Sequence, residues 1–504
     1  MAKTPEISPL GFKTWANRHE TFTQTINNYY DIKNGDTGNI VSDYNATTAA
    51  VQTLIGQAIT EGRTVRALGA GWSFSPIAAT DGWILNTRFL NMLFTVTSDS
   101  TSNIYPGDRN QLLFVQCGNS VQELNLYLNS VNKSLKTSGA SNGQTISGAF
   151  STGTHGAAFD FGATPDFVVG MHVILSKDKH VWLERSSYPV VSDSFISRLN
   201  TVIIRDDEIF NAALVNLGSF GFIHGVMIET EDIYLLEGYR QSVPYDNSLK
   251  HVMETLDFTN SPLTHGSERP FHFQVVINQY DLKGGAYVTS MYKRPYNNTY
   301  KPPVTDPNKA GPGDDTPVFI GKLTDFIPST IPLIVNKLVK SSLAIEGWWG
   351  TTGEVFTNTD IRGKVLSTAI GIPIAYTNQV TAILMNINNN TPFPGIFAYR
   401  YVKQSKATLA FTQFEHTCVV ELDGVESNLT WGFFRAVWDE LEARNIPHTF
   451  HWGKINRLDS KSVNSYYGER RDRWVKARNK LLPKESLKVF SSPTLNNLGL
   501  DEEI

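Results

Sequence analysis

The chain has 504 residues, a formal net charge of −4, and 41% apolar against 18% charged residues. This composition predicts a large globular protein of two or three domains, and it excludes a disordered chain and a small disulfide-stapled scaffold. A negative balance without a run of Lys and Arg also argues against nucleic-acid binding.

The first regular element is expected between Asp43 and Gly62, where apolar residues follow the i, i+3, i+4, i+7 spacing of a one-sided helix. A β-like run over residues 64–68 comes next and leads into the glycine-rich turn Gly69-Ala70-Gly71-Trp72-Ser73. A second helix is predicted after Ser120, because Ser120 and Glu123 have the spacing of a capping box.

Small residues dominate positions 138–156, and such a segment lets the backbone approach a ligand closely. β-like runs occupy residues 168–175 and 271–280, and a glycine-rich strand entry lies between them at Leu217 to Ile223. Near the end of the chain, residues 428–444 predict an amphipathic helix.

The two cysteines, Cys117 and Cys418, lie far apart and lack CxxC spacing, so neither a disulfide framework nor a zinc site is supported and no metal is expected. The first ten residues lack the basic-then-apolar pattern of a secretory leader. No stretch approaches the roughly 20 apolar residues that span a bilayer. These features predict a reducing, cytoplasmic location and no membrane span.

Consecutive backbone N–H groups in a glycine-rich turn can line a concave site for phosphate oxygens. The turn at residues 69–71 lacks the third glycine of GxGxxG and is not followed by a clear helix, so a Rossmann dinucleotide site is disfavoured. Each glycine-rich segment alone is equally well a tight turn in a large sheet protein. Three of them in order, each attached to a β-like run, favour ligand binding.

Four segments in order resemble the vanillyl-alcohol-oxidase-type flavoproteins, and within them the aldonolactone and alditol oxidase branch: VRALGAGWSFS at 65–75, ISGAFSTGTHG at 146–156, LGSFG at 217–221 and HWGK at 451–454. The resemblance implies an α+β fold in which a two-part FAD-binding domain carries an inserted antiparallel-sheet cap domain. We therefore predict an FAD-binding domain over residues 1–238, a substrate-binding cap over residues 239–430, and a C-terminal segment over residues 431–504 that completes the FAD site.

The resemblance also implies which residues hold FAD. The first two glycine-rich segments would cradle the pyrophosphate, the third would pass near the adenine half, and Ala140 and Ser141 would border the flavin. The predicted cofactor-binding residues are Gly69, Ala70, Gly71, Trp72, Ser73, Ser75, Ala140, Ser141, Ile146, Gly148, Ser151, Thr152, Gly153, Thr154, His155, Gly156, Gly218, Gly221, Ile223 and Lys454.

Members of this branch commonly have a histidine, joined covalently to the flavin, at the position of Trp72. An indole has no nucleophilic nitrogen suited to that bond, so we predict noncovalent FAD. His155, within the THG segment, is expected to be a structural hydrogen-bonding residue beside the cofactor.

Flavin oxidation of an alcohol needs positive charge near the flavin N1 and a base for the hydroxyl proton. Lys454 matches the family's lysine near N1, although most lysines lie at the surface. Arg400 matches the arginine of a substrate-contacting Glu-x-Arg pair whose glutamate position holds Ala398 here. The predicted catalytic residues are Lys454, Arg400, His451 and Glu415, with His416 as a further source of a base, and the predicted substrate-binding residues are Ser141 and Arg400.

The sequence therefore predicts an FAD-dependent oxidoreductase that takes hydride from the CH–OH group of a sugar lactone, a polyol or a more apolar alcohol, with O2 as acceptor giving H2O2. Ala398 and apolar runs between residues 326 and 349 favour a less polar substrate than an alditol. The alternatives are a dehydrogenase with a non-oxygen acceptor, CH–NH oxidation, and a noncatalytic ligand-binding homologue. A carbohydrate hydrolase would need two carboxylates across a cleft, and no such pair is recognisable.

Overall fold

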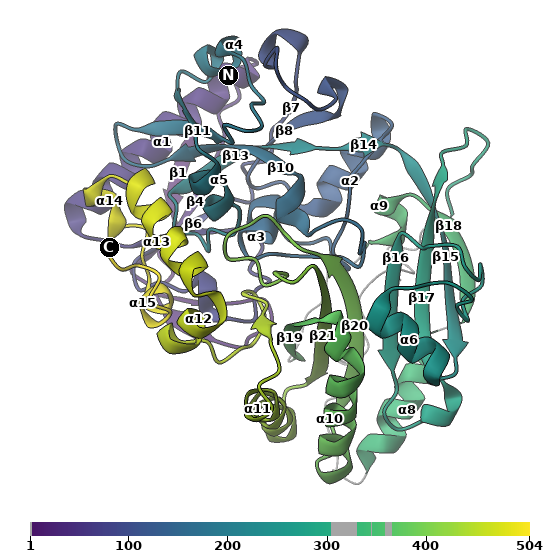
Figure 1. Ribbon diagram of the computed structural model, residues 1–504. Coiled ribbons are helices and arrows are strands. Elements are labelled where there is room, and N and C mark those ends of the chain that lie inside the picture. Colours follow the sequence, from purple (N-terminus) through teal and green to yellow (C-terminus); the bar gives the residue numbers. More distant parts are fainter. Residues whose placement is uncertain (1–2, 304–329, 344, 358–364, 504) are drawn as a thin grey trace.

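The computed structural model describes residues 3–303, 330–343, 345–357 and 365–503 (Figure 1). The apolar run predicted at 326–328 lies outside these residues. Three main sheets organise the described chain, two of them built from its first half and the third from its middle. The mixture of helices and antiparallel strands confirms the predicted α+β class.

The two N-terminal sheets differ in strand direction. The four-stranded sheet pairs β5 and β4 in parallel with β6, whereas all but one of the pairings in the six-stranded sheet are antiparallel. In spatial order, the four strands are β1 (Glu6–Pro9), β4 (Asn28–Lys33), β6 (Trp83–Asn86) and β5 (Val65–Leu68). The six are β12 (Val202–Arg205), β11 (His180–Glu184), β10 (Val168–Ile174), β13 (Phe222–Glu229), β8 (Leu112–Gln116) and β7 (Leu93–Thr95).

The third sheet has eight strands and its pairings are antiparallel, as expected for the cap. We call it the cap sheet. Its strands are, in spatial order, β18 (Glu346–Gly350), β15 (Tyr234–Val243), β17 (Ala286–Pro295), β16 (His272–Ile277), β20 (Gly395–Lys403), β21 (His416–Val425), β19 (Val365–Pro373) and β22 (Thr449–Phe450). Two short ribbons pair β2 (Thr14–Ala16) with β3 (Thr23–Thr25) and β9 (Lys133–Ser134) with β14 (Glu231–Asp232).

Helices cover these sheets. They are α1 (Ile40–Glu61), α2 (Val121–Ser130), α3 (Ile146–Ser151), α4 (Asp193–Arg198), α5 (Asp207–Leu214), α6 (Asn247–Thr255), α8 (Ile331–Ser342), α9 (Thr352–Val355), α10 (Thr377–Asn390), α11 (Asn428–Ala443), α12 (Ser460–Tyr467), α13 (Glu469–Leu481), α14 (Lys484–Leu487) and α15 (Pro493–Asn497). The two sides of β20 explain how the cap is covered. Phe397 and Tyr399 pack with α10 and α11, while Ile396 and Ala398 pack with α8 on the other face.

Local signals explain where the predicted helices begin and end. Gly62 ends α1 in the left-handed conformation, at φ 61°, which an L side chain adopts only with strain. Ser120 and Glu123 form the predicted capping box at the start of α2. The helix predicted near the C-terminus is α11. The boundaries proposed for the three domains, 1–238, 239–430 and 431–504, stay predictions.

The C-terminal segment returns to the N-terminal sheets (Figure 1). The backbone N–H of Val65 donates to the Val489 carbonyl at 2.7 Å, and that of Phe74 donates to the Gly453 carbonyl at 2.7 Å. The Trp474 indole in α13 donates to the Val215 carbonyl at 2.9 Å. The C-terminal segment thus bonds to the chain on both sides of the glycine-rich turn that follows β5.

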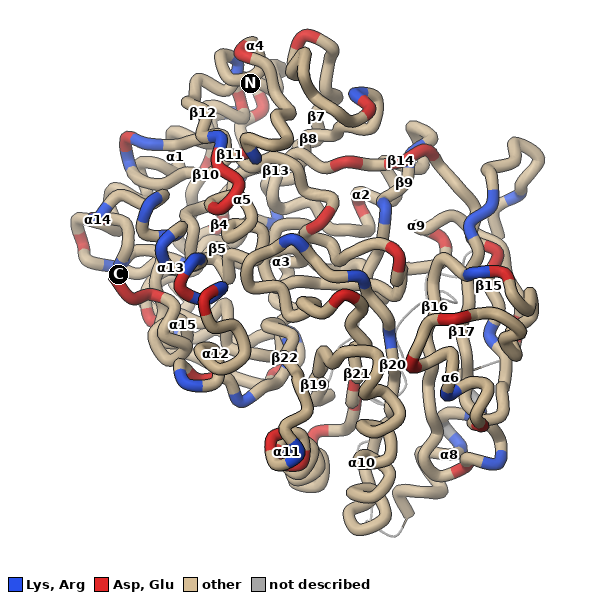
Figure 2. Tube along the Cα trace, viewed as in Figure 1, with Lys and Arg blue, Asp and Glu red and all other residues tan. Residues whose placement is uncertain are grey.

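Charged residues of both signs are mixed over much of the described trace, but residues 137–159 and 365–399, which include α3 and α10, carry none (Figure 2). Among the described residues, no helix is long and apolar enough to cross a membrane. Both cysteines are buried and unpaired.

Candidate functional site

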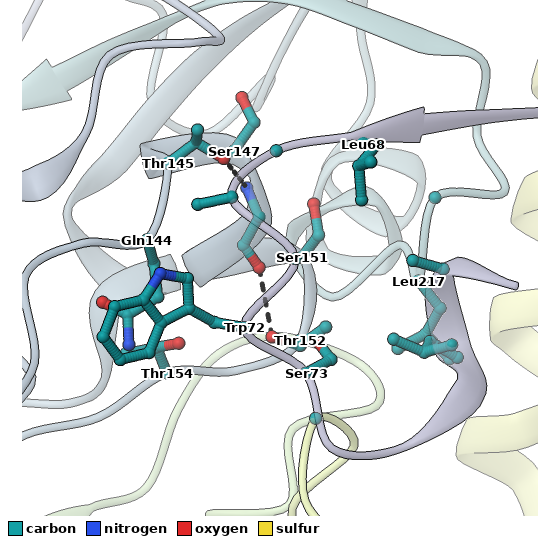
Figure 3. Close-up of a pocket in the computed structure, with 18 of the residues that line it drawn as sticks. Leu68, Trp72, Ser73, Gln144, Thr145, Ser147, Ser151, Thr152, Thr154 and Leu217 are labelled. Atoms are coloured by element: carbon teal, nitrogen blue, oxygen red, sulfur yellow. Dashed lines mark hydrogen bonds between the residues drawn. The ribbon is translucent and has the colours of Figure 1, made fainter. Parts of the chain in front are cut away.

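A large cavity lies where the glycine-rich turns of the N-terminal sheets meet one face of the cap sheet. Its empty space is about 1530 Å³, part of which is open to solvent. Figure 3 shows Trp72 and Ser73 from the turn after β5 together with Thr145, Ser147 and Ser151 from α3 and its cap. The predicted residues that line it are Gly69, Ala70, Gly71, Trp72, Ser73, Ala140, Ser141, Gly148, Ser151, Thr152, Thr154, His155, Gly218, Gly221, Ile223, Arg400, His451 and Lys454.

The turn after β5 approaches α3 so closely that only glycine fits at its start. A Cβ at Gly69 would lie 2.1 Å from the Thr145 hydroxyl oxygen. That hydroxyl accepts the Gly148 N–H at 3.3 Å and caps α3, so it has no freedom to move aside without losing the cap. This side of the cavity is built mainly from backbone.

A second turn, before β13, carries strain. Leu217 adopts φ 52°, a left-handed conformation that is costly for a branched side chain. The buried Arg66 guanidinium holds this turn, donating to the Leu217 carbonyl at 2.5 Å and the Gly218 carbonyl at 3.0 Å. Burial, with a contribution from Arg478, lowers the pKa of Arg66 to about 10, so it remains cationic at neutral pH. The cavity therefore has a buried positive charge at this turn.

The N-terminal β2–β3 ribbon closes another side of the cavity. Its loop is fastened to the turn after β5, because the Arg18 N–H donates to the Gly71 carbonyl at 2.9 Å and the Asn17 amide donates to the Ser73 carbonyl at 2.9 Å. These bonds place His19 in the cavity wall, stacked on Phe74 with 3.9 Å between ring centroids. Burial, with nearby Lys454 and Arg18, lowers the pKa of His19 to about 3, so its ring is neutral.

Several polar groups in the wall have no hydrogen-bond partner among the described residues. They are both ring nitrogens of His19, the indole N–H of Trp72, the side-chain carbonyl of Gln144 and the hydroxyl of Ser147. Buried polar groups are nearly always paired, so a cluster of unpaired ones in one cavity points to a polar ligand. Together with the cationic Arg66 and the backbone-lined turns, this wall fits a dinucleotide with an anionic pyrophosphate.

The opposite wall belongs to the cap sheet and is charged. Arg400 on β20 and Glu421 on β21 are both almost fully buried, with side chains 4% and 2% exposed. The Arg400 Nη1 lies 3.0 Å from Oε1 and 2.9 Å from Oε2 of Glu421. Oε1 also lies 3.6 Å from Nε2 of His155, whose Nδ1 hydrogen-bonds the Gly156 carbonyl.

Lys454 and His451 lie where the C-terminal segment crosses the cap sheet. The Lys454 ammonium donates to the Ser367 hydroxyl on β19 at 2.7 Å and lies 5.1 Å from the Phe74 ring centroid. The His451 Nδ1 accepts the Gly453 N–H at 2.9 Å, so its Nε2 carries the proton of the neutral ring. Burial, followed by nearby His155 and Lys454, lowers the pKa of His451 far below its usual range.

Five predicted residues and His416, the alternative source of a base, do not line the cavity. Ser75 donates to the Trp452 carbonyl, Ile146 opens α3, Gly153 packs against Phe411, and Gly156 lies against the Ser138 backbone. These four support the wall from behind. Glu415 is exposed just before β21 begins and is not brought to the cavity, whereas Glu421, six residues further along the chain, is buried and lines it.

Ala398 lies directly opposite Glu421 in the β20–β21 pairing. The position where the resemblance expects a glutamate therefore has a carboxylate beside it, supplied by the next strand. Sequence analysis missed Glu421, since no local motif marks a residue whose neighbours come from another strand. It also missed His19, which has no glycine-rich signature, and Arg66, which lies within the segment at 65–75 without being predicted as a site residue.

The apolar runs of the cap contribute to its core. Ile331, Val335 and Val339 of α8 cluster with Val276, Ile396, Ala398 and Val425 of the cap sheet, and none of them lines the cavity. The expectation that these residues favour an apolar substrate is therefore not supported. The cap-sheet wall beside the cavity is polar and charged.

Comparison with known proteins defines the class. Residues 44–184 match the FAD binding domain family, so the chain carries an FAD-binding domain of the predicted type. Its homologues are lactone oxidases and dehydrogenases, which confirms the resemblance found in the sequence.

Three relatives show how far the similarity extends. A D-arabinono-1,4-lactone oxidase of Debaryomyces hansenii is 27% identical over 40% of this chain and 33% of its own length. The chain thus matches only about a third of the length of such relatives. An L-gulono-1,4-lactone dehydrogenase of Mycobacterium tuberculosis is 22% identical over 86% of this chain and 91% of its own length. The crystal structure of a cholesterol oxidase from B. sterolicum shares the fold, with a TM-score of 0.68 and 13% identity over 98% of this chain and 97% of that one.

Proposed function

We propose that this protein is an FAD-dependent oxidoreductase that oxidises the CH–OH group of a small polar alcohol, with a sugar lactone or related polyol as the substrate class. One observation carries the proposal. Lys454 and Arg400 converge from the C-terminal segment and the cap sheet on the same cavity as the glycine-rich turns of an FAD-binding domain. The names of the relatives, which are lactone oxidases and dehydrogenases, support the substrate class.

The turns at residues 69–73 and 217–218 and the start of α3 would hold the cofactor, with Arg66 near its anionic part. When bound, FAD supplies a two-electron acceptor for hydride. The chain's own contribution is to hold the substrate hydroxyl, exclude water and place charge. Arg400 is buried in the wall and positions or polarises the substrate oxygen.

Lys454 supplies a second positive charge. Its ammonium is anchored by the Ser367 hydroxyl and lies near the Phe74 ring, so it is held at the junction of the two walls. A preorganised cation in a water-poor cavity stabilises negative charge that develops during reaction far more than it would in water. His451 is neutral, and its Nε2–H serves as a hydrogen-bond donor rather than as a base.

FAD is held without a covalent bond in this proposal. Trp72 lines the cavity and offers only an indole N–H, which donates a hydrogen bond but is not a nucleophile. Acid precipitation of the purified holoprotein tests this point. The flavin should stay in the supernatant, and a yellow pellet would contradict noncovalent binding.

The electron acceptor has two candidates. O2 is favoured by the relatives named oxidases, and another acceptor is favoured by the relative matched over 91% of its length, which is named a dehydrogenase.

The test is to add lactones, polyols, sterols and amines to the FAD-loaded protein without air, and then admit air. Bleaching by a lactone or polyol supports the proposed substrate class, and bleaching only by a sterol or an amine contradicts it. Rapid return of colour with peroxide identifies an oxidase, and slow return identifies a dehydrogenase.

A further inference from the structure

Glu421 is a buried carboxylate in the wall of the cavity. It lies near the centre of β21, with β20 on one side and β19 on the other. Its partners across the strands are Ala398 and Ala369, two of the smallest side chains available. The carboxylate is therefore not covered by its neighbours on the sheet, and it contributes to the cavity lining.

The partners of Glu421 keep it negatively charged and fix its direction. One Arg400 nitrogen lies within 3.0 Å of both carboxylate oxygens, and such a charge-assisted contact stabilises the ionised form. Removing an ion from water is costly, so a buried pair in a cavity wall indicates a role other than stability alone. One carboxylate oxygen, Oε1, also faces His155.

His155 is oriented to take a proton on the side of Glu421. A carbonyl oxygen only accepts hydrogen bonds, so the bond to the Gly156 carbonyl at 2.9 Å requires the proton of the neutral ring on Nδ1. The other nitrogen, Nε2, lies 3.6 Å from Oε1 of Glu421. A second proton on Nε2 would give an imidazolium beside a carboxylate, an arrangement that the charge of Glu421 stabilises.

We propose that Glu421 and His155 form the proton-accepting pair of this enzyme. This pair rests on the proposed function: the substrate hydroxyl would hydrogen-bond to Glu421, and FAD, when bound, would accept the hydride from the adjoining carbon. The O–H bond breaks, its electron pair forms the carbonyl, and the proton passes through Glu421 to Nε2 of His155. The substrate loses two electrons, which bound FAD would take up.

Other titratable groups of the wall suit this task less well. His19 and His451 lie beside Lys454, and their depressed pKa values oppose taking up a proton. Burial raises the pKa of the Cys117 thiol, which leaves it protonated. Lys454 is engaged as a donor to Ser367. Among the residues that line the cavity, the pair of Glu421 and His155 is the one with an anion placed to stabilise the transferred proton.

The test uses Glu421→Gln, which keeps the shape of the side chain but removes its charge. Flavin reduction by the substrate should become about 10²–10⁴-fold slower, the usual contribution of a positioned general base. The dissociation constants for FAD and for a non-reacting deoxy analogue should change less than tenfold. Rapid mixing without air gives the reduction rate, and spectral titration gives the two dissociation constants.

The matched control is Glu184→Gln. Glu184 is also a buried carboxylate, 2.8 Å from Arg205, and it accepts the Trp182 indole N–H at 2.9 Å outside the cavity. This variant should lose stability and keep the wild-type reduction rate. If Glu421→Gln fails to bind FAD, His155→Gln tests the same pair and should also slow reduction at least about 100-fold.

The outcomes separate this proposal from the one on which it rests. If no alcohol or lactone reduces the wild-type flavin, the proposed function fails, and the pair with it. If the wild type is reduced and either Glu421→Gln or His155→Gln is reduced within about threefold of its rate, the pair alone is refuted.

Discussion

The two walls of the cavity are built on different physical principles. The FAD-side wall consists of glycine-rich turns, main-chain groups and polar side chains without partners among the described residues. In the cap-sheet wall, by contrast, Arg400 and Glu421 are already in contact with each other, and Glu421 also faces His155 of the glycine-rich segment at 146–156. Polar groups of the FAD-side wall can gain hydrogen-bond partners from a ligand, whereas the charged groups of the cap-sheet wall are held in place by one another.

This difference separates cofactor binding from catalysis. Unpaired polar groups gain most when a ligand supplies their hydrogen bonds, so the FAD-side wall is suited to binding. Charges held in fixed positions need no reorganisation during reaction, so the cap-sheet wall is suited to chemistry. Changes in the first wall should therefore alter cofactor affinity, and changes in the second should alter rate.

A large effect is expected for Lys454→Ala, at the junction of the two walls. Losing a preorganised cation should slow flavin reduction by about 10²–10³-fold, as for loss of one charge-stabilising donor in other enzymes, while FAD stays bound. The reduction rate and the FAD dissociation constant measure the two effects separately. Lys461→Ala, at an exposed position on α12, is the control and should match the wild type. Unchanged reduction by Lys454→Ala would remove its assigned role.

Gly69→Ala tests the FAD-side wall. The added Cβ would lie 2.1 Å from the Thr145 hydroxyl oxygen, and relieving that overlap should cost about 1–3 kcal/mol and weaken FAD binding by about ten- to a hundredfold. Gly432→Ala is the matched control, because nothing lies within 4 Å of its Cβ position in the interior of α11. It should stabilise the protein by about 0.5–1 kcal/mol and leave FAD affinity unchanged. Equal FAD affinity for the two variants would contradict the close-approach argument.

Acid should destabilise both regions through buried neutral histidines. Burial is the first cause that lowers the pKa of His19 and of His272 on β16 to about 3, against 6.5 in a solvated chain. Between these values the unfolded state binds more protons, so stability falls as the pH falls below about 6.5. Each histidine contributes up to about 1.4 kcal/mol per pH unit. Urea unfolding at pH 7 and pH 5 measures this, and equal stability at both would contradict neutral burial.

His19→Phe should have the smallest effect. Phenylalanine keeps the stack on Phe74 but removes two nitrogens that lack partners among the described residues, so the ligand-free protein should be as stable as the wild type or more so. Affinity for FAD or for substrate should fall about tenfold, the value of one hydrogen bond. His172→Phe is the contrast, since its ring bonds both Tyr44 and His180 at 2.8 Å. That variant should lose stability and keep affinity. Unchanged affinity for both ligands in His19→Phe would show that His19 contacts neither.

The sequence predicts the FAD-side wall better than it predicts the cap-sheet wall. The FAD-side wall depends on local signals, such as the glycines at 69 and 71, and these can be recognised in one stretch of chain. The place of Glu421 depends on the pairing of β20 with β21, which no local pattern encodes. His19 enters the wall only because its loop is hydrogen-bonded to the turn at Gly71. Long-range register and docking, rather than local propensity, fix these residues.

The most direct measurement is the visible spectrum of the FAD-loaded protein before and after a lactone or polyol is added without air. The proposed function predicts that the protein retains flavin and that at least one such substrate bleaches its visible band. A protein that takes up no FAD, or a bound flavin that no lactone or polyol reduces, would contradict it.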